Sequence, residues 1–200
     1  MTFFITLEGI DGAGKSTHVD FIKKCFEKKT IPCELTREPG GTVLGEKIRE
    51  ILLHDDMTVS TETLLMFASR NEHVNTFIKP KLENSISIIC DRFTDASYAY
   101  QYGGKGIDPS WINILTNLVH PELKPDLTFI FDIDPSEAKA RISIERELDK
   151  FENSSLAFFN DVRNAYLELS KTSNHYCVID SSQPISKIQM IIEKKLENIL

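Results

Sequence analysis

A glycine-rich stretch near the N-terminus constrains the fold of this chain more than any other feature. It has the phosphate-loop spacing, which is a glycine, four residues and then Gly-Lys-Ser, and it reads Gly9, Ile10, Asp11, Gly12, Ala13, Gly14, Lys15 and Ser16. Glycines let the backbone turn tightly, so that successive N–H groups can point at one phosphate. Such a loop needs a buried strand before it and a helix after it. The apolar segment 3–8 predicts that strand, and the apolar spacing in segment 15–28 predicts that helix.

The rest of the chain alternates between short apolar runs and longer amphipathic segments. We predict strands at residues 3–8, 33–37, 86–91, 127–133 and 176–180. We predict helices at residues 15–28, 44–53, 61–82, 109–120, 135–141, 155–171 and 184–200. Helices that alternate with apolar strands are typical of a parallel sheet covered on both faces. The expected fold is therefore three-layer α/β, with five parallel strands and a ligand site at their carboxyl ends.

Composition sets limits on the class of protein. Two hundred residues suit one domain spanning 1–200, with a polar excursion at about 141–154. A net charge of −7 argues against nonspecific binding to nucleic acid or to an anionic membrane. Apolar runs are too short to cross a bilayer and no basic-then-apolar leader opens the chain, so we expect a cytoplasmic protein. The four cysteines and five histidines show no metal-ligand spacing, so we expect reduced thiols and no structural metal.

Several polar residues fall where strands are predicted to end. In a phosphate loop, Lys15 supplies a positive charge and Ser16 offers a hydroxyl to Mg²⁺. Asp91 ends the strand at 86–91, where its carboxylate could hold Mg²⁺ or cap the next helix. Arg37 ends the strand at 33–37, Arg92 follows the strand at 86–91, and Arg70 lies in a helix; the planar guanidinium of each matches phosphate oxygens.

Three other features each allow a structural and a functional interpretation. Phe67 has the spacing of a core residue in its helix, but its ring could also stack on a base. Gln101 follows two tyrosines, and its amide can donate to and accept from a pyrimidine. The charged segment from Arg141 to Lys150 is either a solvated helix surface or a closing lid whose arginine reaches a transferring phosphoryl group.

Taken together, these motifs resemble the signature of the thymidylate kinases, enzymes that phosphorylate dTMP. The motifs follow the phosphate loop in a fixed order: Arg37-Glu38-Pro39-Gly40-Gly41-Thr42, Phe67-Ala68-Ser69-Arg70, Asp91-Arg92-Phe93 and Ala99-Tyr100-Gln101. The resemblance continues to Ile179-Asp180-Ser181-Ser182-Gln183-Pro184 and so covers nearly the whole chain. It implies the P-loop nucleoside-monophosphate-kinase fold, transfer of phosphate from ATP to dTMP to give dTDP for DNA synthesis, and a homodimer that needs Mg²⁺.

The resemblance also implies roles for individual residues. Lys15, Ser16, Thr17 and the loop backbone from Gly9 would hold ATP phosphates and Mg²⁺, with Asp91 as a further metal ligand and Ser182 and Gln183 near the adenine. Arg70 and Arg92 would hold the dTMP phosphate. Asp11 would contact the sugar, and Tyr100 would crowd its 2′ position. Phe67 would stack on thymine, while Gln101 and Ser97 would lie at its polar edge. Glu38 and Pro39 would line the acceptor pocket.

The position of the catalytic arginine varies within the family. Here Gly12 stands where one type carries arginine in the phosphate loop, so the chain resembles the bacterial type with its arginine in the lid. Arg141 and Arg146 are both candidates for that arginine. Lys105 departs from the pattern, because relatives often carry arginine there.

Two other functions compete with this interpretation. A deoxynucleoside kinase would phosphorylate a neutral hydroxyl and would want a carboxylate base, for which Glu38 is the candidate. A nucleotide-binding switch would hydrolyse slowly and would have no small-molecule acceptor. A GTPase switch should also carry an Asn-Lys-x-Asp motif, which this sequence lacks.

Overall fold

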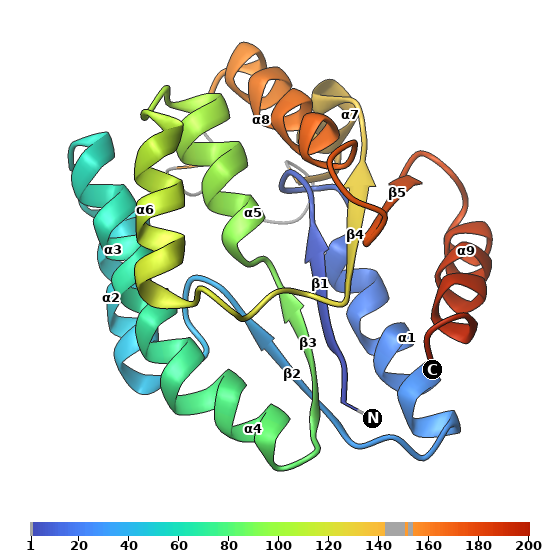
Figure 1. Cartoon of the computed structure of the whole chain (residues 1–200). Coiled ribbons are helices and arrows are strands. Elements are labelled where there is room, and N and C mark those ends of the chain that lie inside the picture. The colour runs from blue at the N-terminus through green and yellow to red at the C-terminus, as the bar shows by residue number, and fades with distance from the viewer. Residues whose placement is uncertain (1, 143–150, 152–153) are drawn as a thin grey trace.

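The computed structural model of the chain describes residues 2–142, 151 and 154–200. Five parallel strands form one sheet, with β1 (Phe4–Glu8) in its centre (Figure 1). The order is β2-β3-β1-β4-β5, where the other strands are β2 (Cys33–Arg37), β3 (Ser87–Asp91), β4 (Leu127–Asp132) and β5 (Tyr176–Asp180). All five predicted strands are confirmed, each to within one residue at either end. The predicted α/β fold with a five-stranded parallel sheet is also confirmed.

The apolar sequences of the central strands follow from their burial on both faces. Every residue of β1 is buried, and so are the first five residues of β4. β1 pairs with β3 on one side and with β4 on the other. Polar residues on these strands are paired: the hydroxyl oxygens of Thr6 and Thr128 lie 2.7 Å apart.

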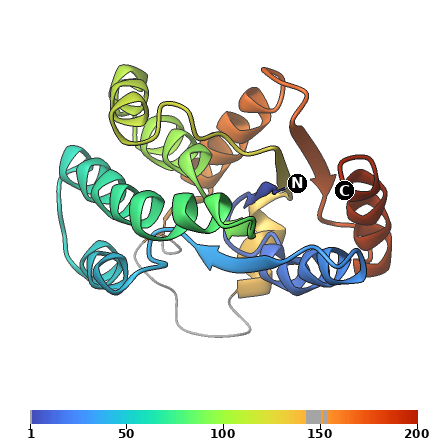
Figure 2. The same cartoon turned by 60° about the horizontal axis from the view of Figure 1, so that its bottom comes forward.

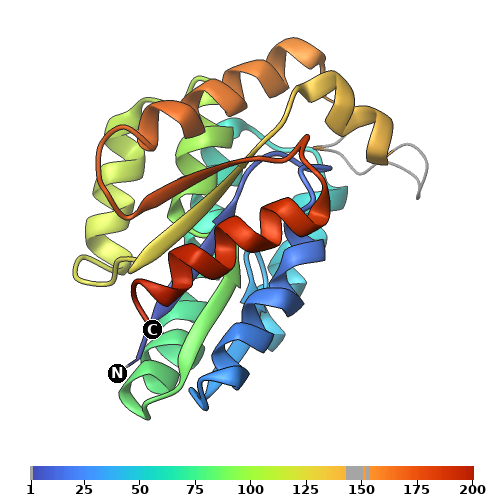
Figure 3. The same ribbon diagram turned by 90° about the vertical axis from the view of Figure 1, so that its right-hand side faces the viewer.

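Helices cover both faces of this sheet. α1 (Lys15–Lys28) and α9 (Ile185–Glu197) contact each other on one face (Figure 3). The other face is covered by α8 (Leu156–Leu169) and by the π-helix η2 (Tyr98–Gly104), with the short α5 (Thr94–Ser97) leading into η2. α6 (Pro109–Val119) packs outside η2, and α7 (Pro135–Ile142) follows β4.

The helix predicted at 61–82 is longer and less regular than expected. α3 (Val59–His73) passes through a π-helical turn, η1 (Val74–Ile78), into α4 (Lys79–Glu83). α2 (Val43–His54) lies beside α3 at the β2 edge of the sheet (Figure 2). Hydroxyl caps start both neighbouring helices, since Thr42 accepts from the Gly45 N–H and Thr58 accepts from the Thr61 N–H.

The helical segment 94–104 was not predicted, because its two glycines disfavour a helix. The structure explains them: a Cβ on Gly103 would lie 2.6 Å from the Cβ of Ala165, so the glycine allows α8 to approach closely. Pro135 opens α7 as predicted, whereas α9 begins one residue after Pro184, which is its cap. The four cysteines are free thiols, as predicted. Within the described residues, no helix combines the length and apolar content of a membrane span.

Candidate active site

The phosphate loop connects β1 to α1, as predicted. Gly9 has φ 136°, and a Cβ there would lie 2.5 Å from the carbonyl oxygen of Phe131, so only glycine fits against β4. Gly14, with φ 84°, is the last residue before α1. The Lys15 ammonium lies over the loop and donates to the carbonyls of Gly9 and Ile10, both at 3.0 Å. Burial lowers the pKa of Lys15, because the charged ammonium is partly removed from water.

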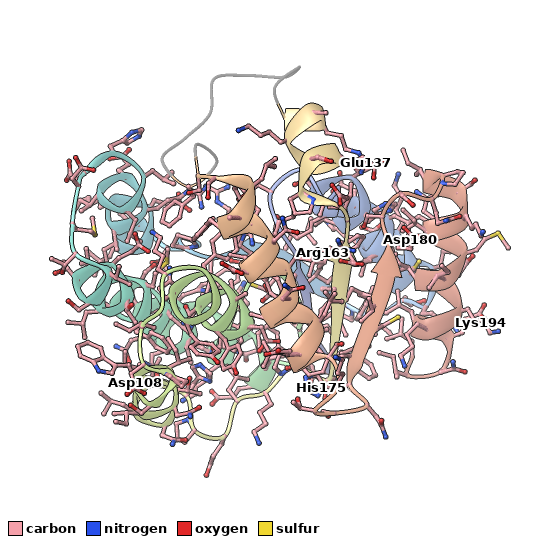
Figure 4. All side chains as sticks on the ribbon, turned by 90° about the horizontal axis from the view of Figure 1, so that it is seen from above. Asp108, Glu137, Arg163, His175, Asp180 and Lys194 are labelled. Carbon is pink, nitrogen blue, oxygen red and sulfur yellow. The ribbon has the colours of Figure 1, made fainter. Side chains whose placement is uncertain are left out.

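An open cleft lies over this loop. It is lined by most of the predicted ATP-binding residues: Asp11, Gly12, Ala13, Gly14, Lys15, Ser16, Thr17 and Gln183. The first two loop residues, Gly9 and Ile10, instead line a smaller pocket against β4. The hydroxyl of Ser182 donates to a carboxylate oxygen of Asp180 at 2.6 Å. Asp180 is the last residue of β5 and is labelled in Figure 4. Arg37 also borders the cleft, although its guanidinium is paired with Glu46 at 2.9 Å.

Asp91 supplies the strongest evidence for a metal site. It ends β3 and lines the cleft together with Ser16. Its Oδ1 is buried and has no hydrogen-bond partner among the described residues. Phe93 stands at the cap position before helix α5, and no side-chain hydrogen bond caps this helix, so Asp91 does not serve as its cap. A buried carboxylate oxygen without a partner is unfavourable, and Mg²⁺ prefers oxygen ligands, so Asp91 and Ser16 fit this ion.

A second cavity adjoins the cleft. We call it the acceptor cavity. Eight residues that the sequence predicted for acceptor binding line it: Asp11, Glu38, Pro39, Arg70, Arg92, Ser97, Tyr100 and Gln101. Asp11, Glu38, Arg49 and Arg92 line both this cavity and the cleft. The two cavities therefore share a border of two acids and two arginines, directly beside the phosphate loop.

Arg92 is the central charge of this border. Its backbone has φ 71°, a left-handed conformation that is unusual for a residue other than glycine. Its guanidinium donates to the carbonyl of Gly9 at 2.8 Å and to Asp11 at 2.6 Å. Tyr100 donates to the other oxygen of Asp11 at 3.2 Å. Burial alone would raise the pKa of Asp11, but Arg92 and Lys15 lower it to about 2, so the carboxylate is charged at neutral pH.

Arg70 crosses the acceptor cavity from α3 and is nearly fully buried. It donates to Glu38 at 2.7 Å, to Ser97 at 3.1 Å and to the carbonyl of Phe93 at 3.0 Å. A guanidinium has five N–H groups. Residues in the described part of the chain accept from three of them, so two are left for a ligand. The second oxygen of Glu38 lies 3.0 Å from Nδ1 of His73.

Phe67 takes the core position that its helical spacing predicts. Its ring is 2% exposed and packs with Ile112 and Val119 of α6. The guanidinium carbon of Arg70 lies 4.5 Å from the ring centroid. The ring therefore stands behind the residues that line the acceptor cavity, and stacking on a base stays a prediction.

Only part of the predicted lid lies within the described residues. Arg141, near the end of α7, lines the cleft and donates to the carbonyl of Ser181 at 3.0 Å. Arg146 and most of the segment 141–154 lie outside the described residues.

Sequence reasoning missed several residues that line the acceptor cavity. Arg49 is the most informative of these, because it borders both cavities and donates to the carbonyl of Pro39 at 3.0 Å. Leu53, Met66, Phe93, Ala96 and Phe151 complete the apolar part of the wall. A signal for Arg49 existed in the sequence, since it is a charged residue beside the apolar face of a predicted helix.

Comparisons with known proteins agree with this geometry. A family model described as thymidylate kinase matches residues 7–192. A thymidylate kinase from Janthinobacterium sp. (strain Marseille) is 50% identical over 189 residues, which cover 93% of this chain and 92% of the relative. One from Methylobacillus flagellatus is 47% identical over 187 residues, with the same two shares. The crystal structure of thymidylate kinase from Ehrlichia chaffeensis superposes with a TM-score of 0.78 at 34% identity and covers 98% of both chains. The chain therefore belongs to the thymidylate kinase family.

Proposed function

We propose that this protein transfers a phosphoryl group from ATP to dTMP and releases ADP and dTDP. Membership of the thymidylate kinase family supports this reaction. The observation that carries the proposal is the border of Asp11, Glu38, Arg49 and Arg92, which joins the phosphate-loop cleft to the acceptor cavity. A donor phosphate over the loop and an acceptor in the second cavity would meet at this border.

The reaction requires charge compensation more than proton transfer. The second proton of a phosphate monoester has a pKa of about 6. dTMP is therefore largely a dianion at neutral pH and needs no general base. The obstacle is repulsion between two anionic phosphates, which nearby cations and alignment overcome. Arg92 stands where the two cavities meet, Lys15 lines the cleft on the donor side, and Arg70 lines the cavity on the acceptor side.

The individual roles are proposals that rest on these positions. Arg92 and Arg70 hold the acceptor phosphate, and Asp11 fixes Arg92 while contacting the sugar. Tyr100 restricts the 2′ position of the sugar. Gln101 and Ser97 face the base, Phe67 supports it, and Glu38 and Pro39 shape the wall.

On the donor side, the phosphate loop with Lys15, Ser16 and Thr17 holds the ATP phosphates, while Ser182 and Gln183 lie near the adenine. Asp91 and Ser16 would hold Mg²⁺, which when bound neutralises part of the charge on the ATP phosphates. Arg141, already in the cleft, or Arg146 contributes the lid arginine. We further propose that residues 1–200 form one domain, of which 141–154 is the lid.

The structure disfavours the competing nucleoside kinase, for which Glu38 would be the base. Burial alone would raise the pKa of Glu38, but Arg70 and His73 together lower it below its ordinary value. A carboxylate bound by a guanidinium on one oxygen and by a histidine on the other is a weak proton acceptor. Glu38 therefore serves better to orient Arg70 than to deprotonate a hydroxyl.

The decisive experiment measures ADP release from Mg·ATP with dTMP, thymidine, dUMP or no acceptor. We expect strong stimulation by dTMP and weaker stimulation by dUMP. Stimulation by thymidine instead would move the function to a nucleoside kinase. ATP binding without stimulation by any acceptor would indicate a nucleotide-binding switch.

We also propose a homodimer and a cytoplasmic location, as the family resemblance implies. An apolar strip on α6 supports the dimer: Trp111, Ile114 and Leu118 share one helix face, and Leu118 is 76% exposed. Leu64 of the adjoining α3 is exposed as well. Light scattering of the purified protein should give twice the chain mass, and Leu118→Glu should shift it toward a monomer.

A further inference from the structure

A buried carboxylate behind the acceptor cavity has no part in the reaction described above. Glu62, in α3, is 2% exposed and does not belong to the lining of either cavity. Its Oε1 accepts from Nε2 of Gln101 at 3.0 Å and from Nζ of Lys105 at 2.7 Å. Its Oε2 accepts from the same ammonium at 2.6 Å. The three residues thus form one buried cluster, of which only Gln101 reaches the cavity.

Glu62 determines which end of the Gln101 amide faces the cavity. A free glutamine can present either its NH₂ group or its carbonyl oxygen to a ligand. An ionised carboxylate accepts hydrogen bonds and cannot donate one. The NH₂ group of Gln101 must therefore turn to Glu62, which leaves its Oε1 on the other side. Among the described residues no donor bonds to this oxygen, and Gln101 is part of the lining of the acceptor cavity.

Lys105 keeps this arrangement in place. Its ammonium donates to both oxygens of Glu62, so both oxygens of the carboxylate act as hydrogen-bond acceptors. The same ammonium lies 4.4 Å from the ring centroid of Phe151, which lines the acceptor cavity. The lysine therefore joins the cluster to the wall of the cavity.

We propose that Glu62 and Lys105 are positioning residues that make Gln101 an obligatory hydrogen-bond acceptor and so set the choice of base. This inference rests on the proposed function, in which the base is thymine. Thymine and uracil carry a hydrogen on N3, which can donate to the Gln101 carbonyl. Cytosine has a lone pair at N3 and would face that carbonyl acceptor against acceptor. The cluster thus selects bases with an N3–H and rejects cytosine.

The test compares kcat/KM for dTMP with kcat/KM for dCMP in the wild-type protein and in Glu62→Gln. The new amide can either donate or accept, so Gln101 becomes free to turn its NH₂ group to the cavity. We expect the dTMP-to-dCMP ratio to fall about tenfold, the scale of one mismatched hydrogen bond. The change should appear mainly in KM for the two acceptors, with KM for ATP unchanged. Lys105→Arg keeps the cation and should keep the ratio, which makes it the matched control.

Two outcomes would overturn the inference. An unchanged ratio in a folded Glu62→Gln protein, whatever its total activity, would reduce the cluster to a structural role. If Glu62→Gln does not fold, Lys105→Met tests the cluster from its partly exposed end, and an unchanged ratio there would equally refute the proposal. A wild-type protein that fails to phosphorylate dTMP would overturn the proposed function and this inference together. An unchanged ratio in a variant overturns the inference alone, so the two failures can be distinguished.

Discussion

The stability of this protein should fall as the pH rises from 5.5 to 7.5, because of one glutamate at the end of the central strand. Glu8 is 0% exposed. Its Oε1 accepts from the N–H of Phe93 at 2.7 Å, and its Oε2 accepts from the hydroxyl of Tyr166 at 2.8 Å. Burial, together with the like charge of Asp95, raises the pKa of Glu8 to about 8 from its ordinary 4.5, and the opposing effect of Arg92 is smaller.

The sign and size of the effect follow from proton linkage. Between these two pKa values the folded protein holds a proton on Glu8 that the unfolded chain has released, so folding takes up a proton and stability decreases as pH rises. Each pH unit then changes the free energy of unfolding by about 1.4 kcal/mol, and partial ionisation at the upper end leaves a total of about 2.5 kcal/mol between pH 5.5 and 7.5.

The perturbation that isolates this effect is Glu8→Gln. The amide oxygen can accept from the Phe93 N–H, and the amide NH₂ can donate to the Tyr166 hydroxyl oxygen, so both contacts survive without a titrating group. Asp95, whose pKa burial raises to about 6, interacts with Glu8, so the difference between the two proteins also contains the interaction between these two carboxyls. We expect the wild type to lose about 2.5 kcal/mol relative to the variant over this range.

The assay is urea unfolding of both proteins at pH 5.5, 6.5 and 7.5, with the free energies extrapolated to water. The quantity of interest is the difference between the two proteins at each pH, since titrating groups that do not interact with Glu8 cancel in it. If that difference stays constant, Glu8 is ionised throughout the range and the reasoning from its burial is wrong.

Three further changes have defined outcomes. Arg92→Ala should lower kcat with dTMP by about 10³-fold while circular dichroism stays unchanged, and near-normal kcat would contradict its proposed role. Asp91→Asn should raise the Mg²⁺ concentration that gives half-maximal rate, and an unaltered Mg²⁺ titration would remove Asp91 from the metal site. Gly9→Ala should lower the free energy of unfolding by about 3 kcal/mol, because residue 9 has φ 136° and the new Cβ would lie 2.5 Å from the carbonyl oxygen of Phe131. Urea denaturation measures this loss, and a fully stable variant would show that the loop can shift.

The sequence predicted those parts of the fold that depend on local pattern. The strands β1 and β4 were recognisable because their residues are mostly apolar, as burial on both faces demands. The segment 94–104 was not recognisable as a helix, because Gly103 and Gly104 have low helix propensity. Their presence is explained by the close approach of α8, which the local sequence does not reveal. The π-helical turns in η1 and η2 likewise have no pattern of their own in the sequence.

The site divides in the same way. The phosphate loop is contiguous, so its motif and its position could be predicted together. The cluster of Glu62, Gln101 and Lys105 joins residues 39 and 43 positions apart, and no spacing rule marks such a buried pair. For Phe67, helical periodicity predicts the buried face but not that the guanidinium of Arg70 would cover the ring.

The central position of β1 has a consequence for how the chain is made. This strand is synthesised before both of its neighbours, β3 and β4, and Thr6 meets its partner Thr128 across a separation of 122 residues. Contacts of such high contact order form late. A nascent chain therefore carries this largely apolar strand, with the phosphate loop attached, without its β4 partner until Thr128 has been synthesised. During that interval the strand is the segment that chaperones would have to shield from association with other chains.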